Sequence, residues 1–161
     1  MSTPQLKLIK LFTEKILPKV HLISIAISVA GLILHSLKID GGALLIMLGF
    51  SLLASVYFLT AIYFIEISGS IKPSLYATLV FKLIYIACSV TIIGSLLELL
   101  KFEGGKQQLT IGCGALTIGL LIAVAFITIK QNNLVILKKP ILHGIAILIL
   151  GGYILFKSTT L

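Results

Sequence analysis

The sequence has no arginine, no tryptophan and only five acidic residues among its 161. Arginine is the usual residue for bidentate contacts with bases and phosphates, so its absence argues against a nucleic-acid partner. The two cysteines, Cys88 and Cys113, lie in apolar runs with neither CxxC spacing nor a histidine cluster nearby, which argues against a metal or redox pair.

Motifs for enzymatic chemistry are also missing. The sequence contains no glycine-rich phosphate loop, no HExxH and no serine nucleophile with a matching histidine and acid. The hydrophilic stretches are too short to house a soluble active site. We therefore predict no catalytic residues, no cofactor, no metal site and no enzymatic activity.

Charge is scarce, and apolar residues take its place. Hydrophobic residues make up 58% of the chain and charged residues 11%, with a mean hydropathy of +1.18. An ordinary soluble domain is about 25% charged, and a soluble chain of this length needs polar residues to cover its surface. The composition predicts an all-α, integral membrane helical bundle in contact with membrane lipids.

Five apolar runs are long enough to be considered as membrane spans. They cover roughly 20–37, 43–65, 75–100, 109–129 and 141–156. The fifth is the shortest, so it must recruit flanking residues, thin the bilayer or lie partly re-entrant. In domain terms, these runs predict a first hairpin at 20–65, a second at 75–129 and a fifth helix at 141–157.

The N-terminal segment 1–19 differs from the rest, because its lysines alternate with apolar residues on one helical face. Two interpretations are open: an amphipathic helix at the membrane surface, or an extension of the first span. We expect no cleaved signal peptide, since the first long apolar run begins only at Val20.

Lysine distribution predicts the orientation. The N-terminal segment and the two connections on its side carry nine lysines, against four on the other side. The positive-inside rule then places the N-terminus in the cytoplasm and the C-terminus outside a bacterial cytoplasmic membrane.

An internal repeat appears when the sequence is shifted by 63 residues. Segments 31–49 and 94–112 then agree at seven of nineteen positions, and Asp40 also matches Glu103. Because shared glycines and charges are less expected by chance than shared leucines, we interpret this as a tandem helical-hairpin repeat. The identical pairs are Gly31 and Gly94, Leu34 and Leu97, Leu37 and Leu100, Lys38 and Lys101, Gly41 and Gly104, Gly42 and Gly105, and Gly49 and Gly112.

The repeated Gly-Gly predicts a tight turn in each copy, where the chain must leave one span and enter the next within about five residues. The residues predicted for these hairpin turns are Lys38, Asp40, Gly41, Gly42, Lys101, Glu103, Gly104 and Gly105.

A stripe of small and polar residues is the second shared feature. Spacings of four, three and four place these residues on one helical face, and such faces allow membrane helices to approach closely. We therefore predict that the stripes pack against other helices. Their members are Ser24, Ser28, Gly31 and His35 in the first span, and Thr91, Gly94 and Glu98 in the third.

Ionisable residues within spans are candidates for function. His35 and Glu98 lie near the predicted outer ends of their spans, where interfacial anchoring or a mutual ion pair is the structural interpretation and a proton or ion path the functional one. His21 and His143, each three residues after a proline, are expected to be interfacial.

The segment LHSLKIDGG followed by ALLIMLGFSLLASVYFLT, within 31–60, resembles the membrane hairpin of gliding-motility protein L and related small membrane proteins of Bacteroidota. Membership would imply an inner-membrane protein that assembles with partners, in the motor case as a proton-driven stator. The span at 43–65 lacks the acid expected of such a motor, so the resemblance supports the architecture and not the motor role.

Taken together, these patterns predict a non-enzymatic accessory or scaffold subunit that packs against other membrane subunits or against itself. The alternative is a small transporter or proton/ion pathway between the two hairpins.

Overall fold

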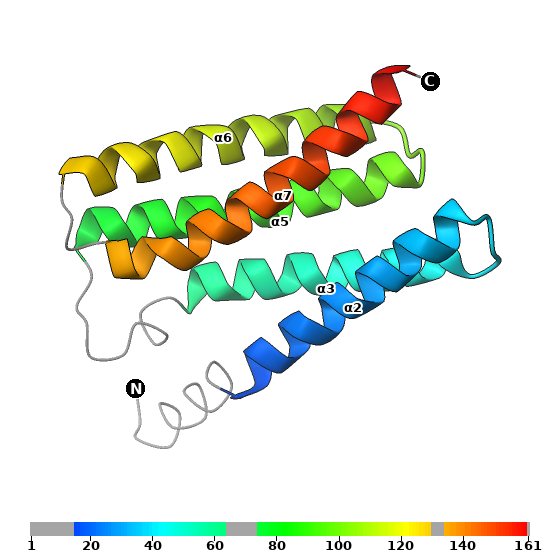
Figure 1. The fold of residues 1–161 in the computed structure, drawn as a ribbon, viewed down its shortest axis with the longest axis horizontal. Helices are drawn as coiled ribbons and strands as arrows, with labels where there is room; N and C mark the ends of the chain where they lie inside the picture. Colours follow the sequence, from blue (N-terminus) through cyan, green and yellow to red (C-terminus); the bar gives the residue numbers. More distant parts are fainter. Residues whose placement is uncertain (1–14, 64–73, 130–133, 161) are drawn as a thin grey trace. The chain divides into compact units, whose positions relative to one another are not determined.

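A computed structural model describes residues 15–63, 74–129 and 134–160. Five α-helices occupy these ranges (Figure 1). They are α2 (Leu17–Ser36), α3 (Gly42–Ile62), α5 (Leu75–Leu99), α6 (Gly105–Ile129) and α7 (Leu134–Thr160). Each is long and apolar enough to cross a membrane, which confirms the prediction of an all-α, five-span architecture and makes the chain a multi-pass membrane protein.

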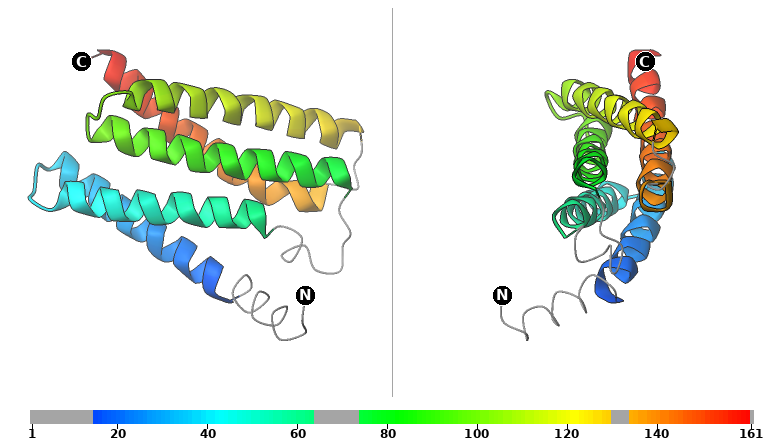
Figure 2. Two further views of the ribbon diagram at one scale, coloured as in Figure 1. Left: turned by 180° about the vertical axis from the view of Figure 1, so that it is seen from behind. Right: turned by 90° about the vertical axis from the view of Figure 1, so that its left-hand side faces the viewer.

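The chain divides into two compact units, 1–72 and 73–161. The first unit holds the antiparallel hairpin of α2 and α3. In the second, α5 and α6 form a hairpin, and α7 packs against both of its helices (Figure 2). Each hairpin is thus closed by helices that follow each other directly in the sequence.

The two hairpin turns have the same backbone hydrogen bonds at positions 63 residues apart. At the end of α2, the Lys38 amide donates to the His35 carbonyl at 3.1 Å and the Ile39 amide to the Leu34 carbonyl at 3.0 Å. At the end of α5, the corresponding bonds of Lys101 to Glu98 and Phe102 to Leu97 measure 3.0 and 2.9 Å. This pattern is a Schellman motif, which satisfies the last carbonyls of a helix and turns the chain back.

The fifth helix begins earlier than predicted. The sequence predicted it at 141–157, but α7 runs from Leu134 to Thr160 and contains Pro140. A proline inside a helix removes one backbone hydrogen bond and its ring crowds the preceding turn, but Leu137 and Pro140 are both fully buried. Packing of these first turns therefore outweighs the local signal, and the helix has ample length to span.

Two other boundaries bear on the predictions. α6 begins at Gly105 instead of 109, so its polar residues 106–108 are helical. Most of the N-terminal segment lies outside the described residues, but Ile16, next to α2, has helical angles of φ −85° and ψ −51°.

Candidate functional site

Glycines bring the paired helices into backbone contact at matching places in both hairpins. A β-carbon on Gly31 of α2 would lie 2.7 Å from the Ile46 nitrogen of α3, and one on Gly94 of α5 would lie 2.6 Å from the Leu109 Cα of α6. Both distances are shorter than a β-carbon can tolerate. The helices therefore approach as closely as they do because glycine stands at these positions.

The second contact point lies deeper in each hairpin. A β-carbon on Gly49 would lie 2.6 Å from the Ser28 nitrogen, and one on Gly112 would lie 2.8 Å from the Thr91 Cα. Gly49 thus packs on a member of the α2 stripe, and Gly112 on the corresponding member of the α5 stripe.

The two glycines at each turn have different structural roles. The first glycine has a positive φ, 88° at Gly41 and 81° at Gly104. The second lies against the preceding helix, since a β-carbon on Gly42 would lie 2.5 Å from the His35 nitrogen and one on Gly105 would lie 2.7 Å from the Glu98 nitrogen. Every glycine shared by the two copies therefore has a geometric reason.

The lysines of the turns share an unusual conformation. Lys38 has a φ of 56° and Lys101 a φ of 57°, a region that costs a residue with a side chain about 1–2 kcal/mol. The four charged turn residues, Lys38, Asp40, Lys101 and Glu103, are all exposed. Sequence reasoning assigned positive φ to the glycines and missed it at the lysines.

The stripe residues within the helices are buried, and the hydroxyl groups bond to their own helix. Ser28 donates to the Ser24 carbonyl at 2.7 Å, Ser24 to the Val20 carbonyl at 2.8 Å, and Thr91 to the Ala87 carbonyl at 2.8 Å. These bonds satisfy each hydroxyl donor without a second helix or a water. At the turn ends of the stripes, His35 is exposed and Glu98 half-buried.

A third helix completes the second hairpin. Buried residues recur along α7 at spacings of three and four. They form one face of the helix, which packs into the surface between α5 and α6. A β-carbon on Gly151 would lie 2.8 Å from Cys113 Sγ of α6 and 2.9 Å from Thr91 Cγ2 of α5. The buried face of α7 consists of Leu137, Pro140, Gly144, Ile147, Gly151 and Ile154.

Two histidine–tyrosine pairs link helices within the units. His21 Nε2 of α2 lies 3.2 Å from the Tyr57 hydroxyl of α3, and His143 Nδ1 of α7 lies 3.2 Å from the Tyr85 hydroxyl of α5. Both histidines are half-buried and pair helices. His21 is also near the start of α2, as the sequence predicts, but His143 is the tenth residue of α7, because this helix already begins at Leu134. The partners are 36 and 58 positions away in the sequence, and no local pattern identifies them.

One buried hydroxyl group differs from those of the stripes, because it has no hydrogen-bond partner within the described ranges. Among the described residues, Ser95 Oγ of α5 is buried and has no hydrogen-bond partner, although Thr91, one turn earlier, bonds to its own helix. In the same part of the chain, no group of three or more His, Cys, Asp or Glu side chains is placed to hold a metal ion.

Two helical glycines differ from all those above. A β-carbon on Gly114 of α6, or on Gly152 of α7, would meet no heavy atom of the described chain within 4 Å. Both residues are exposed. They leave two open notches, one on the outward face of each helix.

The relationships of the chain to known proteins give no further guide to these sites. The resemblance of 31–60 to gliding-motility protein L stays a prediction, because the comparisons do not test it. No protein-family model matches the chain, and comparison with curated proteins and with solved structures found no similar protein.

Proposed function

We propose that this protein is a non-enzymatic accessory or scaffold subunit of a larger membrane complex, and that the outward face of α7 binds the neighbouring subunit. The observation that carries the proposal is the open glycine on this face, Gly152. A glycine in the interior of a helix costs about 1 kcal/mol relative to alanine. The buried glycines of α7, Gly144 and Gly151, bring it close to α5 and α6, whereas Gly152 has no such use within the described chain.

The residues around Gly152 form a continuous helix-packing seam. Leu142, Ile145, Ile149 and Phe156 are spaced with Gly152 at intervals of three and four, and each is between 45% and 70% exposed. The buried residues of α7 that pack against α5 and α6 have the same spacing. A small residue within such a seam is the feature that membrane helices use for close approach, so we infer that another helix occupies it, from a second subunit or a second copy.

The remaining parts of the proposal come from the sequence. The lysine distribution favours a cytoplasmic N-terminus, and the resemblance would imply a bacterial inner membrane. The absence of catalytic motifs supports a role without enzymatic activity.

The test is mild purification from native membranes followed by identification of what migrates with the protein. We expect a partner in fixed stoichiometry with the wild-type chain, and about tenfold weaker retention with Gly152→Leu, which corresponds to about 1.4 kcal/mol. Gly114→Leu is the matched control, because it fills the open glycine of a different helix and should retain the partner. A wild-type chain that runs alone as a monomer would overturn the proposal.

A conduit for protons or ions is the second candidate, and Ser95 favours it. Its buried, unbonded hydroxyl lies about one turn before the half-buried Glu98 and about one turn after Thr91, so an unsatisfied polar group stands between the end of α5 and the buried part of its stripe. On this hypothesis, Glu98→Gln should lower ion flux into proteoliposomes at least tenfold and leave partner retention unchanged. If Glu98→Gln weakens only assembly, the conduit hypothesis fails.

A further inference from the structure

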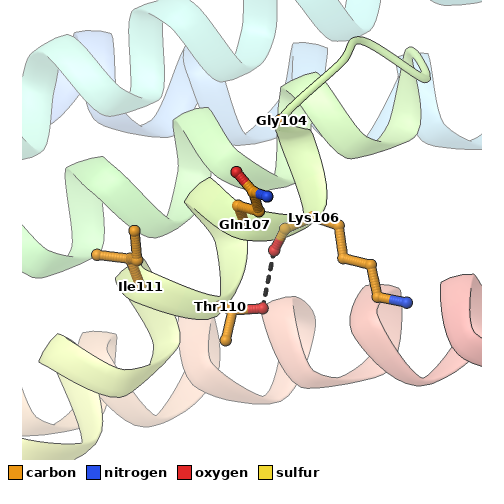
Figure 3. A pocket seen from close by; sticks show the side chains of 5 residues that line it. All are labelled: Gly104, Lys106, Gln107, Thr110 and Ile111. Atoms are coloured by element: carbon orange, nitrogen blue, oxygen red, sulfur yellow. Dashed lines mark hydrogen bonds between the residues drawn. The ribbon is translucent and has the colours of Figure 1, made fainter.

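The start of α6 carries a shallow groove of about 690 Å³ that opens to the outside of the second unit. Gly104, Lys106, Gln107, Thr110 and Ile111 line it (Figure 3). The Thr110 hydroxyl donates to the Lys106 carbonyl at 2.8 Å, while the Lys106 side chain extends away from Thr110 and Ile111 (Figure 3). The groove therefore has cationic and amide groups near the turn and an apolar wall one turn further into the helix.

Comparison with the first hairpin shows that these polar groups are specific to the second. The two turns agree in their helix boundaries, positive-φ positions and backbone hydrogen bonds. Yet Lys106, Gln107 and Thr110 correspond to Ala43, Leu44 and Met47 of the first hairpin. The turn itself therefore does not require polar residues here, and their presence needs another reason.

We propose that this groove binds an anionic phospholipid of the surrounding leaflet. The Lys106 ammonium and the Gln107 amide would donate to the phosphate, and an acyl chain would lie along Ile111 and the open face at Gly114. A charged hydrogen bond to phosphate is among the stronger polar contacts, so the Lys106 ammonium favours an anionic head group over a neutral one.

The position of the groove identifies a lipid as the occupant, in preference to a soluble anion. The spanning part of α6 begins at Gly105 and contains 24 residues, which at 1.5 Å per residue is about 36 Å, longer than the hydrocarbon core of about 30 Å. α6 is therefore long enough for its first turn to reach the head-group layer. Below it, Ile111 and Ile118 are 64% and 58% exposed, and Gly114 between them leaves room for a chain.

The test measures which lipid the purified protein retains. The protein is reconstituted in nanodiscs of phosphatidylcholine with phosphatidylglycerol as the anionic lipid, and the lipids that stay bound in detergent are quantified by native mass spectrometry. For the wild type we expect at least fivefold enrichment of phosphatidylglycerol. The double variant Lys106→Ala with Gln107→Leu, which restores the residues of the first hairpin, should abolish the enrichment. Both side chains are exposed, so folding is not at stake.

Lys38→Asn is the matched control, because it removes one lysine from the other turn and asparagine tolerates positive φ. It should keep the enrichment. Equal loss in the control and the double variant would mean general lysine electrostatics and overturn the proposal, as would a wild type without any preference. Displacement of the lipid by millimolar inorganic phosphate would instead identify a soluble-anion site. Gly114→Leu should reduce retention of every phospholipid in the groove, because it fills the path of the acyl chain.

Discussion

Gly94→Ala is expected to lower the free energy of unfolding of the second hairpin by about 1–3 kcal/mol, the usual cost of forcing an extra carbon into a well-packed site. The new methyl carbon would lie 2.6 Å from both the nitrogen and the Cα of Leu109. Because the obstacle is backbone and not the flexible end of a side chain, α5 and α6 must separate along their length to relieve the clash.

Gly114→Ala is the matched control for this prediction. It makes the same chemical change in α6, at a position where a β-carbon meets no heavy atom of the described chain within 4 Å. Here alanine should raise the free energy of unfolding by about 0.5–1 kcal/mol, through its better helix propensity. The opposite signs can be measured by equilibrium unfolding in mixed micelles. If both variants shift stability in the same direction, the close approach of α5 and α6 is wrong.

The second large effect concerns the turn between α5 and α6, where two residues have positive φ. Gly104→Ala should lower the free energy of unfolding by about 0.5–1 kcal/mol, because the strain of about 1–2 kcal/mol on a residue with a side chain is partly offset by the lower entropy of the unfolded alanine chain, about 0.5–1 kcal/mol. No neighbour lies within 4 Å of the added carbon in the described chain, so the effect contains no packing clash, only backbone strain and chain entropy.

Lys101→Gly should have the opposite effect. It relieves the same strain of about 1–2 kcal/mol and adds about 0.5–1 kcal/mol of unfolded-chain entropy, so we expect a net gain of about 0.5–1 kcal/mol. The same unfolding titration measures both variants, and Lys38→Gly should reproduce the gain in the first hairpin. A loss of stability in both lysine variants would show that the ammonium groups stabilise the turns by more than the strain costs.

The architecture could be predicted from the sequence, because the architecture of a helical membrane protein depends mainly on the length and order of its apolar segments. Span number follows from apolar length, and the repeat follows from glycines and charges that reappear 63 positions apart. The glycines of the stripes could be singled out from the sequence as residues for close approach, since the lack of a side chain has the same meaning in both copies. Gly31 and Gly94 do lie against the next helix.

The missed features depend on contacts that no local pattern encodes. Pro140 is a helix breaker by its own chemistry, and only its burial with Leu137 explains why α7 continues through it. The histidine–tyrosine pairs join residues 36 and 58 positions apart. Likewise, the difference between Lys106 and its counterpart Ala43 becomes informative only because the two turns share the same geometry.

The closure of each hairpin between sequence neighbours has a consequence for biosynthesis. α3 can pack against α2 as soon as it leaves the translocon, before α5 has entered the membrane, because the contacts of Gly31, Gly42 and Gly49 lie within residues 28–49. At about 5–20 residues per second, the rest of the chain needs several more seconds. α7 comes last, and by then the surface between α5 and α6 that receives it is already formed. Insertion of this protein would thus proceed as two hairpins and one docking helix, in which late truncation removes only the final step.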